Sequence, residues 1–167
     1  EKDDPAYTYR QAHRIAETLA GLGVNLNFAP VVDLNTNPGN PVIGKLERSF
    51  SANPDIVTRQ ALAFIKAHHA AGVGCTLKHF PGHGSSTGDS HIGFVDVTET
   101  WSPIELEPYK TIIHQGMADA VMTAHIYNAK LDSRYPATLS KPVITGILRE
   151  KMGYQGVIIS DDMQMGA

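Results

Sequence analysis

The chain has 167 residues, of which 42% are hydrophobic and 19% are charged, and its formal net charge is −3. This is the composition of an ordinary globular domain, and the balance of charge argues against a basic surface for nucleic acid or for an anionic membrane. Cys75 is the single cysteine, which excludes an internal disulfide framework and a CxxC redox or zinc site. No apolar run reaches the length of a membrane-spanning helix.

Helices and strands alternate along the predicted chain. Apolar residues at helical spacing indicate the helices, and continuous apolar runs indicate strands that are buried on both faces. In chain order we predict a helix at 5–20, a strand at 24–34, a helix at 54–71, a strand at 73–80, a helix at 102–114, a strand at 120–126, a helix at 141–151 and a strand at 156–160.

Capping residues support the predicted helix starts. Asp4 and Asn53 are N-cap residues, and each is followed by a proline in the first turn. Ser102 and Glu105 have the spacing of a capping box, in which the glutamate bonds back to the cap. On the helix at 54–71, the residues expected to face the core are Ile56, Ala63, Phe64, Ala67 and Ala71.

The alternation predicts an α/β fold with parallel strands and right-handed crossovers. A doubly wound nucleotide-binding fold would have G-x-G-x-x-G after its first strand, and no such spacing occurs. Polar residues end all four predicted strands instead, which is typical of a TIM barrel: Asp33, Lys78 with His79, His125 and Asp161. A (β/α)8 barrel needs about 250 residues, so four strand–helix pairs supply about half of one.

The segment 78–91 departs from the regular pattern. It reads KHFPGHGSSTGDSH and combines a lysine, three histidines and an aspartate with three glycines and a proline. It can therefore form neither a regular helix nor a continuous strand. The alternative is a glycine-rich surface turn with incidental histidines, but such turns seldom concentrate so many titratable groups. We predict that this loop carries the chemistry at the carboxyl end of the sheet.

Hydrolysis by a carboxylate and a proton donor is the chemistry that these residues favour. Asp161 ends an apolar strand, where its carboxylate can act as a nucleophile. Helix capping is the structural alternative for Asp161 or Asp162, and Asp162 is the better cap. Asp89 and His91 lie two residues apart, a spacing that allows a carboxylate to orient an imidazole for proton transfer.

Two cationic residues can each have either a functional or a structural role. Lys78 can hydrogen-bond a neutral polar substrate, or it can form a structural ion pair with a buried carboxylate. Arg48 can bind a hydroxyl or carboxylate through two N–H groups, or it can be a solvated surface residue. The remaining histidines lie in predicted helices and are expected to be surface or packing residues: His13, His68, His69 and His114.

The string KHFPGHG followed by DSH, with the terminal ISDDM, resembles glycoside hydrolase family 3. Within the family it resembles the β-N-acetylhexosaminidase, or β-N-acetylglucosaminidase, branch. FAPVVDL, ERSF and AVMTAHI also resemble the family's strand ends, in the right order. The resemblance covers essentially the whole chain, and KHFPGHG with DSH is its most specific part. It implies an N-terminal (β/α)8 barrel that removes terminal N-acetylglucosamine with retained configuration, commonly in peptidoglycan recycling.

The resemblance also implies roles for individual residues. Asp161 would be the nucleophile, and His91 paired with Asp89 would be the general acid/base, where most glycosidases use a second carboxylate. The residues implied in binding the sugar hydroxyls are Lys78, His79 and Arg48. No cofactor or metal is implied, and the expected partner is a small carbohydrate rather than nucleic acid or a membrane.

In one respect the chain departs from the family. The family has an earlier strand with a DQEGG-like segment, whose aspartate holds the distal hydroxyls of the sugar, and a final strand beyond the nucleophile strand. Neither is found in residues 1–167, so we expect a partial catalytic domain that is poorly active alone. Equal turnover by this segment and by a full-length enzyme would refute that. The compartment, bacterial cytoplasm or periplasm, stays open.

Two other functions compete with this interpretation. A metal-dependent hydrolase would use His79, His83, Asp89 and His91 as zinc ligands. The spacing of the first two is ligand-like only on a helix, which the intervening Pro-Gly forbids; activity that EDTA abolishes, with stoichiometric zinc, would favour it. A non-catalytic carbohydrate-binding barrel is the second alternative, and the intact set of Asp161, Asp89 and His91 argues against it.

Overall fold

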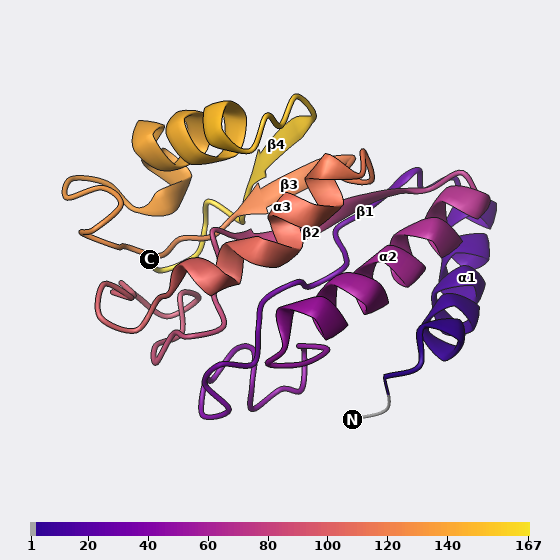
Figure 1. The fold of residues 1–167 in the computed structure, drawn as a ribbon, viewed down its shortest axis with the longest axis horizontal. Coiled ribbons are helices and arrows are strands. Elements are labelled where there is room, and N and C mark those ends of the chain that lie inside the picture. The colour runs from indigo at the N-terminus through magenta and orange to yellow at the C-terminus, as the bar shows by residue number, and fades with distance from the viewer. Residues whose placement is uncertain (1–2) are drawn as a thin grey trace.

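The computed structural model describes residues 3–167 and contains one sheet of four parallel strands with helices packed beside it (Figure 1). The strands are β1 (Leu26–Asn27), β2 (Gly74–Phe80), β3 (Ala120–Thr123) and β4 (Val157–Ser160). The α-helices are α1 (Pro5–Gly21), α2 (Pro54–Ala70) and α3 (Glu107–His114), the 3-10 turns are η1 (Pro103–Leu106) and η2 (Ala137–Leu139), and η3 (Pro142–Lys151) has π-type hydrogen bonds.

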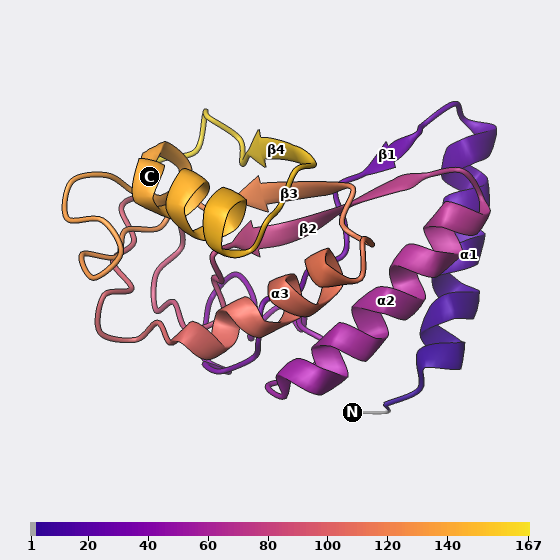
Figure 2. The ribbon, with the colours of Figure 1, turned by 45° about the horizontal axis from the view of Figure 1, so that its top comes forward.

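The strand order follows the chain order, because each strand pairs in parallel with the next one: β1–β2–β3–β4. A doubly wound sheet reverses its direction at a switch point, whereas a TIM barrel advances the same way at every crossover. Figure 2 shows α2 and α3 along the same side of the sheet, with α1 packed against α2. The predicted α/β fold with parallel strands is therefore confirmed, and the sequential order is that of a barrel.

The core lies between the sheet and the helices. β2 is buried along most of its length, as a central parallel strand should be. Phe80 at its end packs edge-to-face on Tyr109 of α3, with ring centroids 5.2 Å apart. β4 borders the sheet, and its first residue Val157 is 58% exposed. This core fixes the carboxyl ends of β2 and β3, from which the functional loops leave.

Two of the predicted helix caps are confirmed. The Asp4 carboxylate accepts a hydrogen bond from the Tyr7 backbone N–H at 2.9 Å, and the Asn53 side chain accepts from the Asp55 N–H at 2.8 Å. The capping box at Ser102 is wrong, because the Ser102 side chain makes no cap hydrogen bond and Glu105 is buried elsewhere. That segment forms the 3-10 turn η1 before α3 begins.

The inward face of α2 was predicted only in part. Ala63 and Ala67 are buried as expected, but Ile56, Phe64 and Ala71 are half-buried. The fully buried apolar residues that the pattern missed are Val57, Ala61 and Ile65. The reason is that α2 packs against both the sheet and α1, so it buries a wider face than a surface helix does.

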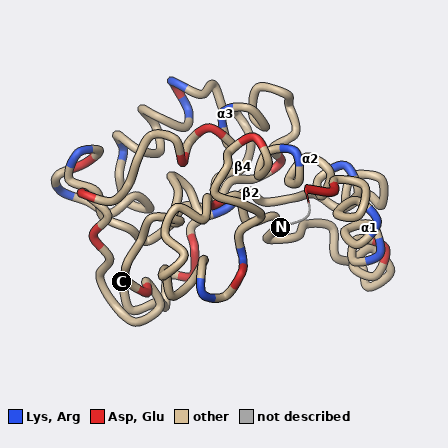
Figure 3. Tube along the Cα trace, turned by 60° about the horizontal axis from the view of Figure 1, so that its bottom comes forward, with Lys and Arg blue, Asp and Glu red and all other residues tan. Residues whose placement is uncertain are grey.

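Two strands are shorter than predicted. β1 has only two residues, although Val31 further along forms an isolated bridge with Lys78. Pro30 lies between them and has no N–H to donate to a ladder. β3 ends at Thr123, three residues before the predicted end. Lys, Arg, Asp and Glu are interspersed along the described trace (Figure 3), and none of its helices is long and apolar enough to cross a bilayer.

Candidate active site

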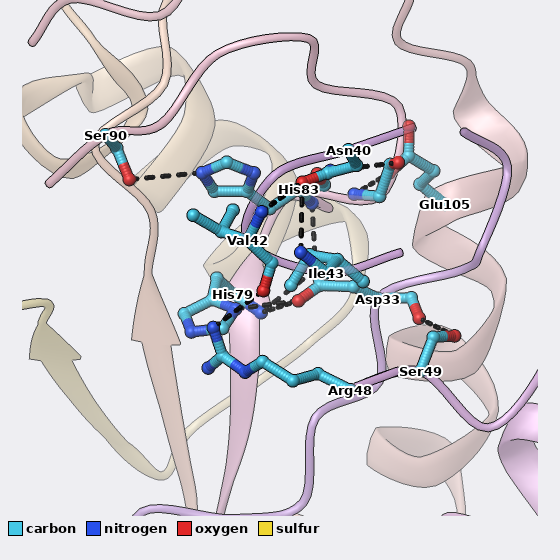
Figure 4. A network of polar contacts seen from close by, with 11 residues as sticks. Asp33, Asn40, Val42, Ile43, Arg48, Ser49, His79, His83, Ser90 and Glu105 are labelled. Carbon is cyan, nitrogen blue, oxygen red and sulfur yellow. Dashed lines mark hydrogen bonds and ion pairs between the residues drawn. The ribbon is translucent and has the colours of Figure 1, made fainter. Parts of the chain in front are cut away.

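A buried carboxylate, Asp33, organises the loop that follows β2. One of its oxygens lies 2.7 Å from Nδ1 of His79, and the carboxylate also accepts the backbone N–H of His79 at 3.1 Å and of His83 at 2.8 Å (Figure 4). Burial by itself would raise the pKa of Asp33. The charges of His79 and His83 and these hydrogen bonds outweigh it and hold that pKa below its ordinary value.

Asn40 ties the loop after β1 to the loop after β2. Its side-chain N–H₂ donates to the carbonyl of His83 at 2.7 Å and of Gly84 at 3.1 Å, while its oxygen accepts the N–H of Val42 at 2.9 Å. The two loops touch so closely that a Cβ on Gly84 would lie 1.7 Å from the carbonyl oxygen of Leu34. Only glycine fits there, so Gly84 of the KHFPGHG string allows close packing of two backbones.

Glu105 supports the same loop from the side of η1. Its Oε2 accepts the Gly84 N–H at 2.9 Å, and Oε1 has no hydrogen-bond partner although the residue is buried. The pKa of Glu105 is raised to about 7. Burial is the largest cause, the contacts with Ser85 and Gly84 oppose it, and the Asp33 carboxylate adds to it. The residue predicted to cap a helix therefore braces the candidate site instead.

The charges of Arg48, Asp161 and Asp33 all act on Lys78. Burial lowers the pKa of Lys78 and the Arg48 guanidinium lowers it further, while the carboxylates of Asp161 and Asp33 raise it; the net direction is downward. Arg48 is held by a hydrogen bond from Nη1 to the Val42 carbonyl at 2.9 Å.

Asp161 follows β4 directly, and hydrogen bonds from neighbouring residues fix the turn in which it lies. Its N–H donates to the carbonyl of Thr123 in β3 at 3.1 Å, and its Oδ1 accepts the N–H of Asp162 at 2.9 Å. The His125 ring reaches across with Nε2 2.9 Å from the Asp162 carbonyl and Nδ1 2.9 Å from Thr138 Oγ1. His125, at the predicted end of the third strand, thus fixes the turn that carries Asp161.

Asp89 and His91 form the predicted pair. Nδ1 of His91 lies 2.7 Å from Asp89 Oδ1, and the same oxygen accepts the His91 backbone N–H at 2.9 Å. The hydrogen bond from that N–H is the main reason that the pKa of Asp89 lies below its ordinary value. The segment that carries the pair, residues 87–93, is called the dyad loop below. The His91 carbonyl accepts the N–H of Gly166 at 3.1 Å, so the dyad loop touches the segment that follows Asp161.

The structure separates the predicted site residues into three groups. Lys78, Arg48 and Asp161 lie together, and Asp89 is paired with His91. His79 is buried, and its Nδ1 lies within hydrogen-bond distance of the Asp33 carboxylate. No hydrogen bond joins the His91 ring to Asp161 within residues 3–167. In that range no three His, Cys, Asp or Glu side chains are arranged to hold a metal ion.

Several residues of the site were not predicted in their observed roles: Asp33, Asn40, His83 and Glu105. Asp33 was recognised only as a polar strand end, and His83 only as a member of the loop string and as a zinc ligand in the competing interpretation. Their position directly after apolar runs was the available signal. Nothing local revealed that Asn40 holds the loop after β2, since its partners in that loop lie more than 40 residues away.

Comparisons with known proteins show the family of the chain. The family model described as the glycosyl hydrolase family 3 N terminal domain matches residues 1–167. A beta-hexosaminidase A of Pseudoalteromonas piscicida is 43% identical over 178 residues, covering 98% of this chain and 29% of the relative. A beta-hexosaminidase of Tolumonas auensis is 42% identical over 154 residues, covering 90% of this chain and 45% of the relative.

Solved structures of the same family resemble the fold closely. A glycoside hydrolase family 3 beta-N-acetylglucosaminidase from a Paenibacillus species has a TM-score of 0.91 at 42% identity, covering 97% of this chain and 31% of its own. A beta-N-acetylhexosaminidase from Beutenbergia cavernae has a TM-score of 0.92 at 32% identity, covering 98% of this chain and 50% of its own. The chain spans less than half of these curated relatives. Its sheet has the TIM-barrel type of fold, and the chain belongs to the glycosyl hydrolase family 3 N-terminal domains.

Proposed function

We propose that this domain carries the active site of a retaining glycosidase that removes terminal β-linked N-acetylglucosamine. The support is twofold. The similar proteins named above are beta-hexosaminidases and a beta-N-acetylglucosaminidase. The described site holds a strand-end carboxylate, Asp161, beside a cationic pair, and an Asp–His pair on a neighbouring loop.

In the proposed first step, the Asp161 carboxylate attacks the anomeric carbon and the bond to the leaving oxygen breaks. His91 gives its Nε2 proton to that oxygen, so the products are a glycosyl ester on Asp161 and a free alcohol. Asp89 holds Nδ1 of the ring, which leaves Nε2 to face the substrate. In the second step His91 takes a proton from water, the water oxygen attacks the anomeric carbon, and the Asp161 carboxylate leaves with overall retention.

Three further side chains are proposed to bind the sugar. Lys78 and Arg48 offer N–H donors beside Asp161, and both are only half-buried, so a hydroxyl can reach them. His79 uses Nδ1 for Asp33 and has Nε2 left for a hydroxyl.

The observation that carries the proposal is the contact between the dyad loop and the chain beyond β4. The His91 carbonyl accepts the Gly166 N–H at 3.1 Å, so the proton donor and the proposed nucleophile are presented by adjoining segments. A covalent mechanism needs these two groups on either side of one glycosidic bond. We also propose terminal N-acetylglucosamine of peptidoglycan-derived muropeptides as the natural substrate.

Trapping of the intermediate tests the mechanism. The full-length protein that contains this sequence is incubated with an activated 5-fluoro N-acetylglucosaminide, digested, and analysed by mass spectrometry. We expect one fluorosugar on the peptide that contains Asp161, and no adduct in Asp161→Asn. An adduct on Asp162, or turnover without any adduct and with inverted product by NMR, would contradict the proposal. Binding without turnover would favour a carbohydrate-binding barrel.

The substrate class needs a separate measurement. We expect kcat/KM of the wild-type protein to be higher for a muropeptide with terminal N-acetylglucosamine than for a chitooligosaccharide of equal length. The reverse order would leave the mechanism intact and move the substrate to chitin-derived sugars.

A further inference from the structure

Ser90 is the buried member of the dyad loop. The side chains of its neighbours Asp89 and His91 are 26% and 59% exposed, whereas Ser90 is 3% exposed. Its hydroxyl lies 3.2 Å from Nε2 of His83 (Figure 4). Ser90, between Asp89 and His91, thus anchors the dyad loop to His83, while the side chains of Asp89 and His91 are more exposed.

The His83 ring is aimed by its own backbone. The His83 N–H donates to Asp33 at 2.8 Å, and the His83 carbonyl accepts from the Asn40 side chain at 2.7 Å. The ring also packs edge-to-face on His79, with centroids 6.1 Å apart. Because buried groups hold both the backbone N–H and the backbone C=O of His83, its backbone cannot follow a moving loop, and the ring is a fixed partner for Ser90.

The chemistry of the ring argues against a simple packing role. His83 is buried, and its Nδ1 has no hydrogen-bond partner, which is costly for a polar group. Burial lowers the pKa of His83 more than the Asp33 carboxylate raises it, so burial disfavours the charged form of the ring. An apolar side chain would fill this space without that cost. The ring's hydrogen bond to Ser90 is what a polar side chain adds here.

We propose that His83 is a positioning residue, whose ring holds Ser90 and thereby sets where His91 and Asp89 meet the leaving group. The inference rests on the proposed function, because it assumes that His91 transfers the proton. Rates of proton transfer depend steeply on placement, and an error of about 1 Å can cost about 10²-fold. Loss of the His83–Ser90 contact should therefore impair the steps that need His91 and spare those that do not.

The test compares two substrates on the full-length protein. One is an N-acetylglucosaminide with a dinitrophenyl leaving group, which departs without a proton, and the other has an alkyl leaving group, which needs one. In Ser90→Ala we expect kcat/KM to fall about tenfold for the alkyl substrate and less than about threefold for the dinitrophenyl substrate. His83→Leu should show the same split, and His83→Gln should recover part of the loss because its amide can reach Ser90.

A double-mutant cycle identifies the contact. If the two residues act through one hydrogen bond, Ser90→Ala combined with His83→Leu should lose no more than either single variant. The control is Ile65→Val, which deletes one core methyl in α2, lowers stability, and should leave the ratio between the substrates unchanged. Melting temperatures of all variants are measured alongside.

The outcomes separate this inference from the proposed function. Equal losses on both substrates, or losses that multiply in the double variant, would overturn the positioning role while wild-type trapping on Asp161 still stands. If His83→Leu does not fold, the substrate ratio in Ser90→Ala decides alone. A wild-type protein that gives no adduct and releases no N-acetylglucosamine would overturn the proposed function itself.

Discussion

Two Asp–His pairs with the same contact distance occupy opposite environments in this domain. Nδ1 of His79 lies 2.7 Å from Asp33, and Nδ1 of His91 lies 2.7 Å from Asp89. The first pair is 8% and 0% exposed, and the second is 59% and 26% exposed. The pairing is equivalent, so burial and the surrounding donors decide what each pair can do.

The two pairs also differ in what they connect. Asp33 joins segments 46 residues apart in sequence and accepts the backbone N–H groups of His79 and His83, so it holds the loop to the sheet. Within residues 3–167 the Asp89 carboxylate bonds only to its near neighbour His91, two residues away. A local pair can move as a unit with its loop, whereas a long-range buried pair cannot move without breaking the fold. The exposed pair is therefore the one proposed for proton transfer.

The largest expected effect is on catalysis by Asp161, the proposed nucleophile. Asp161→Asn removes the proposed nucleophile but keeps the shape of the side chain, so kcat should fall on the order of 10⁴-fold with the fold retained. Steady-state kinetics and circular dichroism measure the two quantities. A mild effect would move the nucleophile elsewhere, with Asp162 examined first.

His91→Ala tests the exposed pair itself. Without a proton donor, kcat/KM on poor leaving groups should fall on the order of 10³-fold, while substrates with good leaving groups are spared in glycosylation. Because the ring is exposed, the melting temperature should barely change. A uniform loss on all substrates would show that His91 binds or orders the site rather than transferring a proton.

Asp33→Asn tests the buried pair. The amide of the variant carries no negative charge to face His79. Its N–H₂ group would also lie beside other N–H donors without an acceptor, so the free energy of unfolding should fall by about 4 kcal/mol. Urea unfolding measures it. The pKa of Asp33 is lowered in the folded state, so its stabilisation is present above the unfolded pKa and lost as the pH falls through the folded one. Unchanged stability would contradict the inference that Asp33 holds the loop after β2.

Glu105 is a buried carboxyl without a histidine partner, and burial is the largest cause of its raised pKa. Its pKa is raised from 4.5 to about 7, so the folded state holds a proton that the unfolded state has lost. Stability should therefore decline as the pH rises from about 4.5 to 7, by at most about 3 kcal/mol from this group. Glu105→Gln should flatten that slope. Urea unfolding at pH 5 and pH 8 measures it, and an unaltered slope in the variant would contradict the assignment.

The smallest effect is expected for the stability of Asp89→Asn. The residue lies on an exposed loop and its contacts are local, so the free energy of unfolding should change by less than about 0.5 kcal/mol. Its activity on poor leaving groups should nevertheless drop, because the His91 ring loses its orienting carboxylate. A large loss of stability would erase the distinction between the two pairs.

Much of the fold could be predicted from the sequence, because it depends on local signals. Apolar periodicity located α1, α2, η3, β2 and β4 to within a few residues. It failed where Pro30 interrupts the first strand, where the third strand ends early, where the turn η1 precedes α3, and at η2, which was predicted as a loop. Asp4 and Asn53 cap their helices as predicted. The error at Glu105 has a clear physical reason: a capping box and a buried brace share one local sequence, and only the packing of η1 against the glycine loop decides between them.

The sequence by itself determined the α/β alternation, the family and the residue types available for catalysis, since these depend on neighbours along the chain. It predicted the Asp89–His91 pair for the same reason, as the two residues lie two positions apart. Only the tertiary structure decided that Asp33 and Asn40 hold the loop after β2 and that His83 meets Ser90. Those contacts form between separate segments, and whether a carboxylate or an imidazole anchors the fold or faces a substrate depends on how deeply that assembly buries it.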